Sequence, residues 1–195
     1  MNRRNFVHTL ALTTMAASLA LAGCTTTGSS GESPATDAAK RQQIDAGVDG
    51  AIAKLYDTVK GSRELVGKAQ GVLVFPAVKK AAFIVGGSYG EGALRVGGAS
   101  VGYYSTAAAS FGLQAGADSS AVFFLFMTQD ALTKFRNSSG WSAGADASVS
   151  LLKVGANGTI DTGSINSEVV AVVLTNAGLM ADVSVAGTKV TRMNL

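Results

Sequence analysis

Residues 71–76 are Gly-Val-Leu-Val-Phe-Pro, and they mark the point at which the apolar pattern of the chain changes. A run of apolar residues between a glycine and a proline is typical of a buried strand. Because proline cannot donate a hydrogen bond to a strand ladder, we expect this strand to end at Pro76. The six residues therefore divide an amino-terminal helical part from a carboxyl-terminal β part.

Two helices are predicted before this boundary. Apolar residues recur there every three or four positions, which places them on one face of a first helix. They are Ile44, Val48, Ile52, Leu55 and Val59. We expect Gly61 to end this helix and Ser62 to cap a short second helix that carries Leu65.

The remainder is predicted to be mostly β. Residues 77–82 are expected to form a turn or a short helical stretch, and Gly90-Glu91-Gly92 is expected to form a tight turn. Strands are predicted at 83–90, 93–96, 108–115, 121–127, 143–153, 169–175, 179–185 and 189–193, and Thr128 is expected to cap a short helix. Glycine weakens a strand unless the strand bends or approaches another backbone closely, so glycine-rich strands indicate a strongly coiled sheet. The predicted class is α+β, with amino-terminal helices packed on a strongly coiled, barrel-like antiparallel sheet.

Aromatic residues gather in the middle of the chain. Phe123-Phe124-Leu125-Phe126 is apolar on both faces, so this strand is expected to be covered on both sides or to face lipid on one. Trp141 is the single tryptophan, and packing in the core is favoured over an interfacial position.

The amino terminus has the order of an export signal. Two arginines, Arg3 and Arg4, precede an apolar run of roughly 16 residues, which is too short to span a bilayer, and small residues then lead to Cys24. The sequence Leu-Ala-Gly-Cys at 21–24 resembles a bacterial lipobox, in which the cysteine is acylated, palmitate being one such acyl group, and becomes the first residue of the mature chain. The predicted organisation is a signal peptide at 1–23, a lipidated flexible tether at 24–38 and one domain at 39–195.

Composition excludes several classes of protein. Without the two signal-peptide arginines the chain has 14 basic and 13 acidic residues, so the net charge does not indicate nucleic-acid binding. The only histidine is His8, inside the signal peptide, and the only cysteine is the predicted lipidation site. Catalysis through histidine or a free thiol is thereby excluded from the mature chain. We expect no enzyme, no cofactor and no metal site, because Asp118, Asp130 and Asp146 match no metal-binding loop.

A basic segment is the first functional candidate. From Lys54 to Arg95 there are seven basic and three acidic residues, a net charge of 7 − 3 = +4. Basic residues near a membrane contribute about 1 kcal/mol each to contact with anionic headgroups. The alternative is that scattered lysines only solvate a helix face.

A glycine-rich run, residues 86–92, is the second candidate. It lacks the lysine and hydroxyl of a phosphate-binding loop, and no helix follows it, so a nucleotide site is not predicted.

Several motifs together resemble the SYLF-domain family. The sequence Lys-Ala-Gln-Gly-Val-Leu-Val-Phe-Pro at 68–76 is similar to the opening motif of this family, and Gly-Gly-Ser-Tyr-Gly-Glu-Gly at 86–92 continues the similarity. The runs Ser-Phe-Gly-Leu-Gln-Ala-Gly-Ala at 110–117 and Asn-Ala-Gly-Leu-Met-Ala-Asp-Val-Ser-Val-Ala-Gly at 176–187 resemble later motifs, although Asp182 replaces the usual glycine. The resemblance covers about residues 40–193.

The resemblance implies a lipid-binding module, related to yeast actin-regulating proteins, in a bacterial lipoprotein member of the family. It implies anionic phospholipids as partners, whereas actin is not expected for an exported protein. The implied lipid-binding residues are Lys54, Lys60, Arg63, Lys68, Lys79, Lys80 and Arg95. We expect a lipid-anchored protein of the cell envelope, at the outer membrane and facing the periplasm or the cell surface. The alternative is a structural or protein-interaction module of the envelope without specific lipid recognition.

Overall fold

A computed structural model describes residues 34–80, 87–108, 119–152, 160, 167–176, 178–179 and 184–195. Cys24, the predicted signal peptide, Asp118 and most of the predicted strand at 108–115 lie outside these residues. Residues Glu32–Leu195 form one compact unit.

Two helices precede the sheet, as the apolar periodicity predicted. Helices α1 (Pro34–Thr58) and α2 (Ser62–Lys68) are followed by β1 (Gly71–Lys80), β2 (Ser88–Val96), β3 (Ala99–Ala108) and β4 (Ser119–Phe126). Helix α3 (Gln129–Asn137) then precedes five short strands. These are β5 (Gly140–Ser142), β6 (Val149–Leu151), β7 (Val169–Thr175), β8 (Gly178–Leu179) and β9 (Lys189–Arg192).

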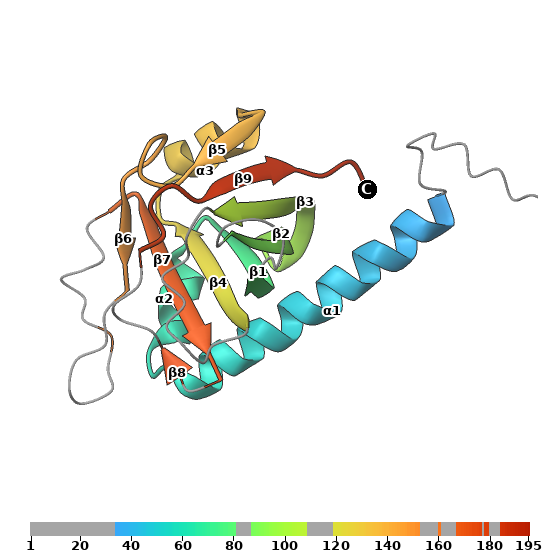
Figure 1. Ribbon diagram of the computed structural model, residues 1–195. Helices are drawn as coiled ribbons and strands as arrows, with labels where there is room; N and C mark the ends of the chain where they lie inside the picture. Colours follow the sequence, from blue (N-terminus) through green and yellow to red (C-terminus); the bar gives the residue numbers. More distant parts are fainter. Residues whose placement is uncertain are drawn as a thin grey trace, which may run out of the picture. The chain divides into compact units, whose positions relative to one another are not determined.

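All these strands belong to one strongly curled sheet, which forms a half-barrel (Figure 1). The strand order is β5-β9-β3-β2-β1-β4-β7-β6, and β8 pairs with β7 beside this path. The predicted α+β class and the barrel-like curl are confirmed. The sheet is antiparallel except for β6, which runs parallel to β7.

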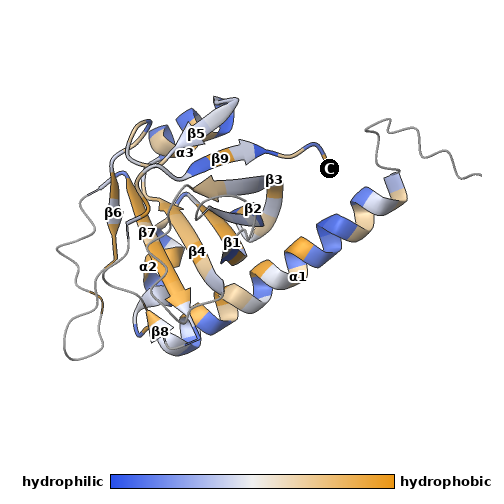
Figure 2. Cartoon of the chain, viewed as in Figure 1, coloured by the Kyte–Doolittle hydropathy of each residue, from blue (hydrophilic) through white to orange (hydrophobic). Residues whose placement is uncertain are grey.

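The core has two layers, one on each face of the sheet. Alternate residues of β4 divide between them, since Phe124 and Phe126 face one layer while Phe123 and Leu125 face the other. The outer layer lies under α1 and α2, and the inner layer lies inside the curl with α3 (Figure 1). Strand β7 and most of β4 are strongly hydrophobic (Figure 2), and both strands are buried on both faces. For β4 this is the first of the two arrangements that its double-sided apolar pattern predicted.

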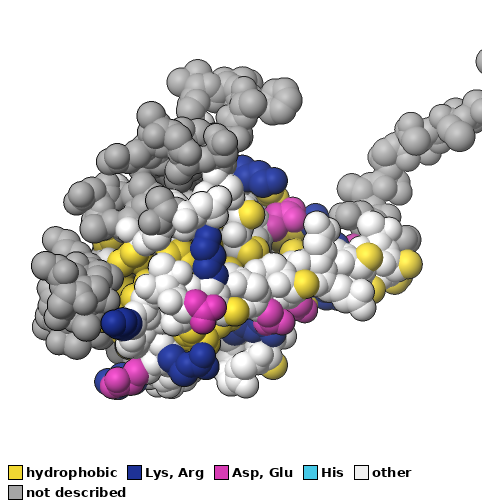
Figure 3. Space-filling model, turned by 90° about the horizontal axis from the view of Figure 1, so that it is seen from below, with side chains coloured by type: hydrophobic (Ala, Val, Ile, Leu, Met, Phe, Trp, Pro, Cys, Tyr) yellow, Lys and Arg dark blue, Asp and Glu magenta, His cyan; other side chains and the backbone are white. Residues whose placement is uncertain are grey.

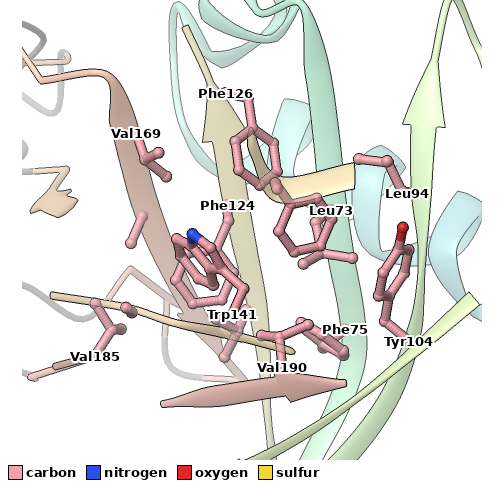
Figure 4. Close-up of a cluster of buried hydrophobic side chains, with 14 of the residues drawn as sticks. Leu73, Phe75, Leu94, Tyr104, Phe124, Phe126, Trp141, Val169, Val185 and Val190 are labelled. Atoms are coloured by element: carbon pink, nitrogen blue, oxygen red, sulfur yellow. The ribbon is translucent and has the colours of Figure 1, made fainter. Parts of the chain in front are cut away.

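Aromatic rings fill the inner layer. Trp141 is 3% exposed and packs edge-on against Phe124, with ring centroids 5.4 Å apart, and against Phe135 at 5.7 Å (Figure 4). Phe126 and Phe135 stack at 4.7 Å. The prediction that Trp141 belongs to the core is confirmed.

Strand β1 does not end at Pro76. It continues to Lys80, and its register with both neighbouring strands shifts around Pro76. At such a bulge the ladder is interrupted, so the missing N–H of proline is tolerated. The predicted turn at 77–82 is wrong up to Lys80, which is the last described residue of the strand.

The glycines of β2 permit close approach rather than a turn. Gly90-Glu91-Gly92 lies inside β2, so the predicted tight turn is wrong. A Cβ atom at Gly92 would collide with the carbonyl oxygen of Val74 on β1, and one at Gly90 would come within 2.9 Å of Val78 Cγ2. The chain turns instead at Gly97 and Gly98, whose φ angles are 59° and 85°, and β3 follows as a strand that the sequence did not predict.

The ends of the helices also differ from the prediction. Helix α1 begins at Pro34, so residues 34–38 are helical although they were assigned to the flexible tether. Proline suits the first turn of a helix, and Asp37 places a negative charge there. Ser62 does not cap α2 but is its first residue, and its hydroxyl donates to the carbonyl of Leu55 at 3.1 Å. Thr128 does cap α3, accepting from the backbone N–H of Ala131 at 3.2 Å.

Candidate membrane-binding surface

Arg95, the last of the predicted lipid-binding residues, lies between α1 and the sheet. Its Nη2 is 2.6 Å from Asp49 Oδ1 and 3.6 Å from Asp45 Oδ1, and its Nη1 donates to the carbonyl of Gly98 at 3.2 Å. Only 15% of its side chain is exposed. Two carboxylates of α1 thus already neutralise this guanidinium, so its contacts are those of a residue that fastens α1 to the sheet.

Asp45 extends this fastening to β3. It accepts hydrogen bonds from Ser100 Oγ at 2.5 Å and from Tyr103 Oη at 2.8 Å. Burial, followed by the hydrogen bond to Asp45, raises the pKa of Tyr103 above its usual value. The phenol therefore stays a donor, and α1 is held against the β2–β3 hairpin by polar contacts.

Four of the predicted residues lie along the end of α1 and the whole of α2. We call this set the helix cations: Lys54, Lys60, Arg63 and Lys68, all exposed. Asp57 and Glu64 are the acidic residues of the segment 54–68, so its net charge is 4 − 2 = +2.

The helix cations differ in their partners. Lys68 pairs with Glu64 at 2.7 Å, an exposed contact whose hydrogen bond lowers the pKa of Glu64. Lys54 Nζ donates to Asn176 Oδ1 at 2.9 Å, and Arg63 lies over the ring of Tyr56 at 4.2 Å. Within the described part of the chain, neither Lys54, Lys60 nor Arg63 has a carboxylate partner.

Lys79 and Lys80 lie elsewhere, at the carboxyl end of β1. Gly71, which follows α2 closely, is eight residues before Lys79, a distance of about 26 Å along an extended strand. Lys79 is exposed, whereas the side chain of Lys80 is not among those the structure describes. The seven predicted residues therefore do not form one patch. On the face that carries α1, basic and acidic side chains are interspersed (Figure 3).

A second basic group comes from α3 and β9, which the sequence analysis did not single out. It consists of Lys134, Arg136, Lys189 and Arg192, all exposed. Arg192 lies opposite Tyr104 in the pairing of β9 with β3, and the ring of Phe135, the residue before Arg136, lies 4.9 Å from the ring of Tyr104. Burial raises the pKa of Tyr104, while Arg192 and Arg136 lower it. No local spacing signals this group, because the pairing of β9 with β3 brings it together.

A comparison with family models agrees with the motifs. Residues 107–194 match the model described as Ysc84: Las17-binding protein actin regulator. This match supports membership of the Ysc84 (SYLF) family. The family is known for lipid-related and actin-related binding. The SYLF match begins near the end of β3, so it includes the second basic group, and the helix cations precede it. No curated protein matches the chain.

Two further findings concern the described residues alone. None of their helices combines the length and the apolar character that crossing a bilayer requires. Their His, Cys, Asp and Glu side chains form no cluster of three that would hold a metal ion.

Proposed function

We propose that the chain is a lipid-anchored envelope protein whose SYLF domain binds anionic phospholipids through the helix cations. The observation that supports this most is the junction of α1 and α2. Lys54, Lys60 and Arg63 are exposed there, and none has a carboxylate partner in the described part of the chain. In this proposal the domain is a binding module and not an enzyme.

The electrostatics are sufficient for a peripheral contact. Each Lys or Arg at an anionic surface contributes about 1 kcal/mol, so three of them contribute about 3 kcal/mol. This is weak for a protein in solution, but an acyl anchor on Cys24 would keep the domain beside the bilayer. Stable attachment generally needs two such signals.

The chain between the anchor and the domain is long enough for this arrangement. Nine residues, 25–33, separate Cys24 from the start of α1, and they reach at most about 30 Å. Helix α1 has 25 residues and is about 37 Å long, which exceeds the reach of the tether, so the helix cannot stand upright while its far end contacts the bilayer. We further propose the outer membrane as the location, facing the periplasm or the cell surface.

Vesicle flotation tests the proposal. The chain from Thr25 to Leu195 contains the whole compact unit but no acyl anchor. We expect it to float with phosphatidylglycerol vesicles and not with phosphatidylcholine vesicles. Binding should weaken when salt rises from about 0.1 M to about 1 M, because the screening length falls from about 10 Å to about 3 Å. Equal binding to both lipids would contradict the proposal.

A protein-interaction module is the second candidate, and the family description, that of a protein-binding regulator, favours it. In that case the domain would not bind vesicles of either lipid. Site-specific cross-linking from the α1–α2 junction would instead join it to one envelope protein, and unlabelled domain would compete with that product.

A further inference from the structure

Buried polar residues are concentrated in one place on the inner face of the sheet. Six polar residues are buried among those the structure describes, and five of them share this place. They are Ser88 on β2, Thr106 on β3, Ser120 on β4, Thr175 on β7 and Thr188, which directly precedes β9. Five different strands or strand ends thus each supply one small hydroxyl side chain.

The register shows that these residues lie at one end of the curl. Thr106 is opposite Gly90, and Ser120 is opposite Val78. Ser88 pairs with Ala108 at the end of β3. Lys189, which follows Thr188, pairs with the neighbouring Ala107. Alternation along each strand gives their direction. Thr106 lies between Tyr104 and Ala108, and Ser120 is two residues from Val122, all three of which belong to the inner core layer.

Within the part of the chain that the structure describes, four of the five hydroxyls have no hydrogen-bond partner. Thr175 donates to the carbonyl of Gly178 at 3.0 Å. The hydroxyl oxygens of Ser88, Thr106, Ser120 and Thr188 have none, although these residues are between 1% and 5% exposed. Buried polar groups in folded proteins are nearly always hydrogen-bonded, so each exception requires an explanation. Three of the exceptions lie on or beside the adjoining strands β9, β3 and β2, and the fourth lies on β4, beyond β1. Four such exceptions at one end of the sheet point to a polar molecule that supplies the missing bonds.

The chemistry of the four side chains restricts what that molecule is. A hydroxyl both donates and accepts, and it carries no charge. Among the side chains that the structure describes, which do not include that of Lys80 opposite Ser88, no charged one is buried beside these hydroxyls. A buried ion without a counter-charge is strongly unfavourable. A ligand that itself carries several neutral hydroxyls would complement the group.

We propose that this inner end of the sheet, which we call the hydroxyl ring (Ser88, Thr106, Ser120 and Thr188), binds an uncharged group with several hydroxyls. Such a group occurs in glycerol and in sugars, either free or as part of a lipid headgroup. The ring lies on the face opposite α1 and α2, so this site does not depend on the proposed membrane contact.

Amide chemical shifts report on the site directly. The ¹⁵N-labelled chain from Thr25 is titrated separately with glycerol, glucose, inorganic phosphate and soluble short-chain phosphatidylglycerol, with short-chain phosphatidylcholine as the lipid control. We expect saturable shifts at the hydroxyl-ring residues with at least one hydroxyl-bearing ligand and none with phosphate. Shifts with phosphatidylglycerol but with neither free compound would identify a lipid as the source.

Thr106→Val is the matched variant, because valine keeps the shape of threonine and removes only the hydroxyl. It should lower the affinity for the ligand that gives saturable shifts by about fivefold, the loss expected for one hydrogen bond. Thr191→Val, on the exposed side of β9, is the control and should leave the affinity unchanged. Ser120→Ala provides a second test if the first variant folds poorly.

Two results would overturn the inference. One is the absence of a saturable shift at the hydroxyl ring with glycerol, glucose and phosphatidylglycerol. The other is a ligand whose affinity is the same in Thr106→Val, Ser120→Ala and Thr191→Val.

Discussion

The two faces of the sheet are covered in different ways. Inside the curl, aromatic rings close on one another, with Trp141 edge-on to Phe124 and Phe135. Outside, α1 combines an apolar stripe with an ionic and hydrogen-bonded attachment, in which Asp45 and Asp49 meet Arg95. The inner face depends on packing, while the outer face depends partly on charge.

This difference separates the charges that hold the fold from those available to a partner. Arg95 carries the same charge as Lys60 and lies in the same basic segment, yet two carboxylates of α1 surround it. Lys60 is exposed and unpaired in the described part of the chain. Net charge along the sequence does not distinguish the two, whereas the helix–sheet contact does.

Removing the central ring of the inner face should have the largest effect. Trp141→Ala leaves a cavity between Phe124, Phe126 and Phe135, and we expect it to lower the free energy of unfolding by about 4 kcal/mol. Chemical denaturation measures this. Val101→Ala, at an exposed position, should change the free energy by less than about 0.5 kcal/mol. Comparable losses for the two variants would contradict the account of the inner core.

Gly92 tests the close approach of β2 to β1. Gly92→Ala places a methyl group against the carbonyl of Val74, which forces the backbone to move. We expect this to lower the free energy of unfolding by about 2 to 3 kcal/mol. Gly50→Ala is the opposite control, because Gly50 lies in α1 with no atom within 4 Å of an added Cβ. The free energy of unfolding of Gly50→Ala should rise by about 0.5 to 1 kcal/mol, because alanine has a higher helix propensity than glycine. A stabilising Gly92→Ala would show that the strands do not approach this closely.

Asp45 tests the polar attachment of the outer face. Asp45→Ala leaves Ser100, Tyr103 and Arg95 without one of their partners. We expect it to lower the free energy of unfolding by about 2 kcal/mol in low salt. The loss should shrink as salt is added, because the attachment is partly exposed, whereas the loss for Trp141→Ala should not. The exposed Asp57, changed to Asn, is the control. Identical salt dependence of the Asp45 and Trp141 variants would remove the distinction between the faces.

The smallest expected effect is a titration. Burial, followed by the hydrogen bond to Glu91, raises the pKa of Tyr89 to about 12. An unfolded tyrosine loses its proton near pH 10, so between pH 10 and 12 the folded state binds more protons than the unfolded state. The stability contributed by this group is therefore complete below pH 10 and is lost as the pH rises toward 12. In an ultraviolet titration of tyrosinate, the unaltered chain and Tyr89→Phe should coincide near pH 10 and differ by one ionisation near pH 12. A difference between them that is already complete near pH 10 would contradict the prediction.

Local patterns predicted the elements whose residues carry their own signal. The apolar stripe of α1, the cap at Thr128 and the limits of β7 follow from spacing and residue type. Strand β3 was missed because Ala, Ser, Gly and Thr make up most of it, so no apolar alternation marks it. Its pairing with β2 and β9 depends on tertiary structure. Continuation of β1 through Pro76 depends on a bulge against two other strands, which the chain around Pro76 does not encode.

The candidate surface was predictable only in part. The exposure of Lys54, Lys60 and Arg63 follows from helix periodicity, since they lie off the apolar stripe. The pairing of Arg95 with Asp49 joins residues 46 positions apart, and the second basic group joins α3 to β9. Both depend on tertiary contacts, so no local spacing could reveal them.

The most direct test of the proposed function compares the two basic groups by an equal change of charge. Lys60→Gln with Arg63→Gln removes two charges at the α1–α2 junction, and Lys134→Gln with Arg136→Gln removes two from α3. Binding of each chain to phosphatidylglycerol vesicles is then measured at low salt. At about 1 kcal/mol per charge, the first variant should bind roughly 25-fold more weakly, while the second should bind like the unaltered chain. The reverse order, or equal losses in both variants, would contradict the assignment of the membrane contact to the helix cations.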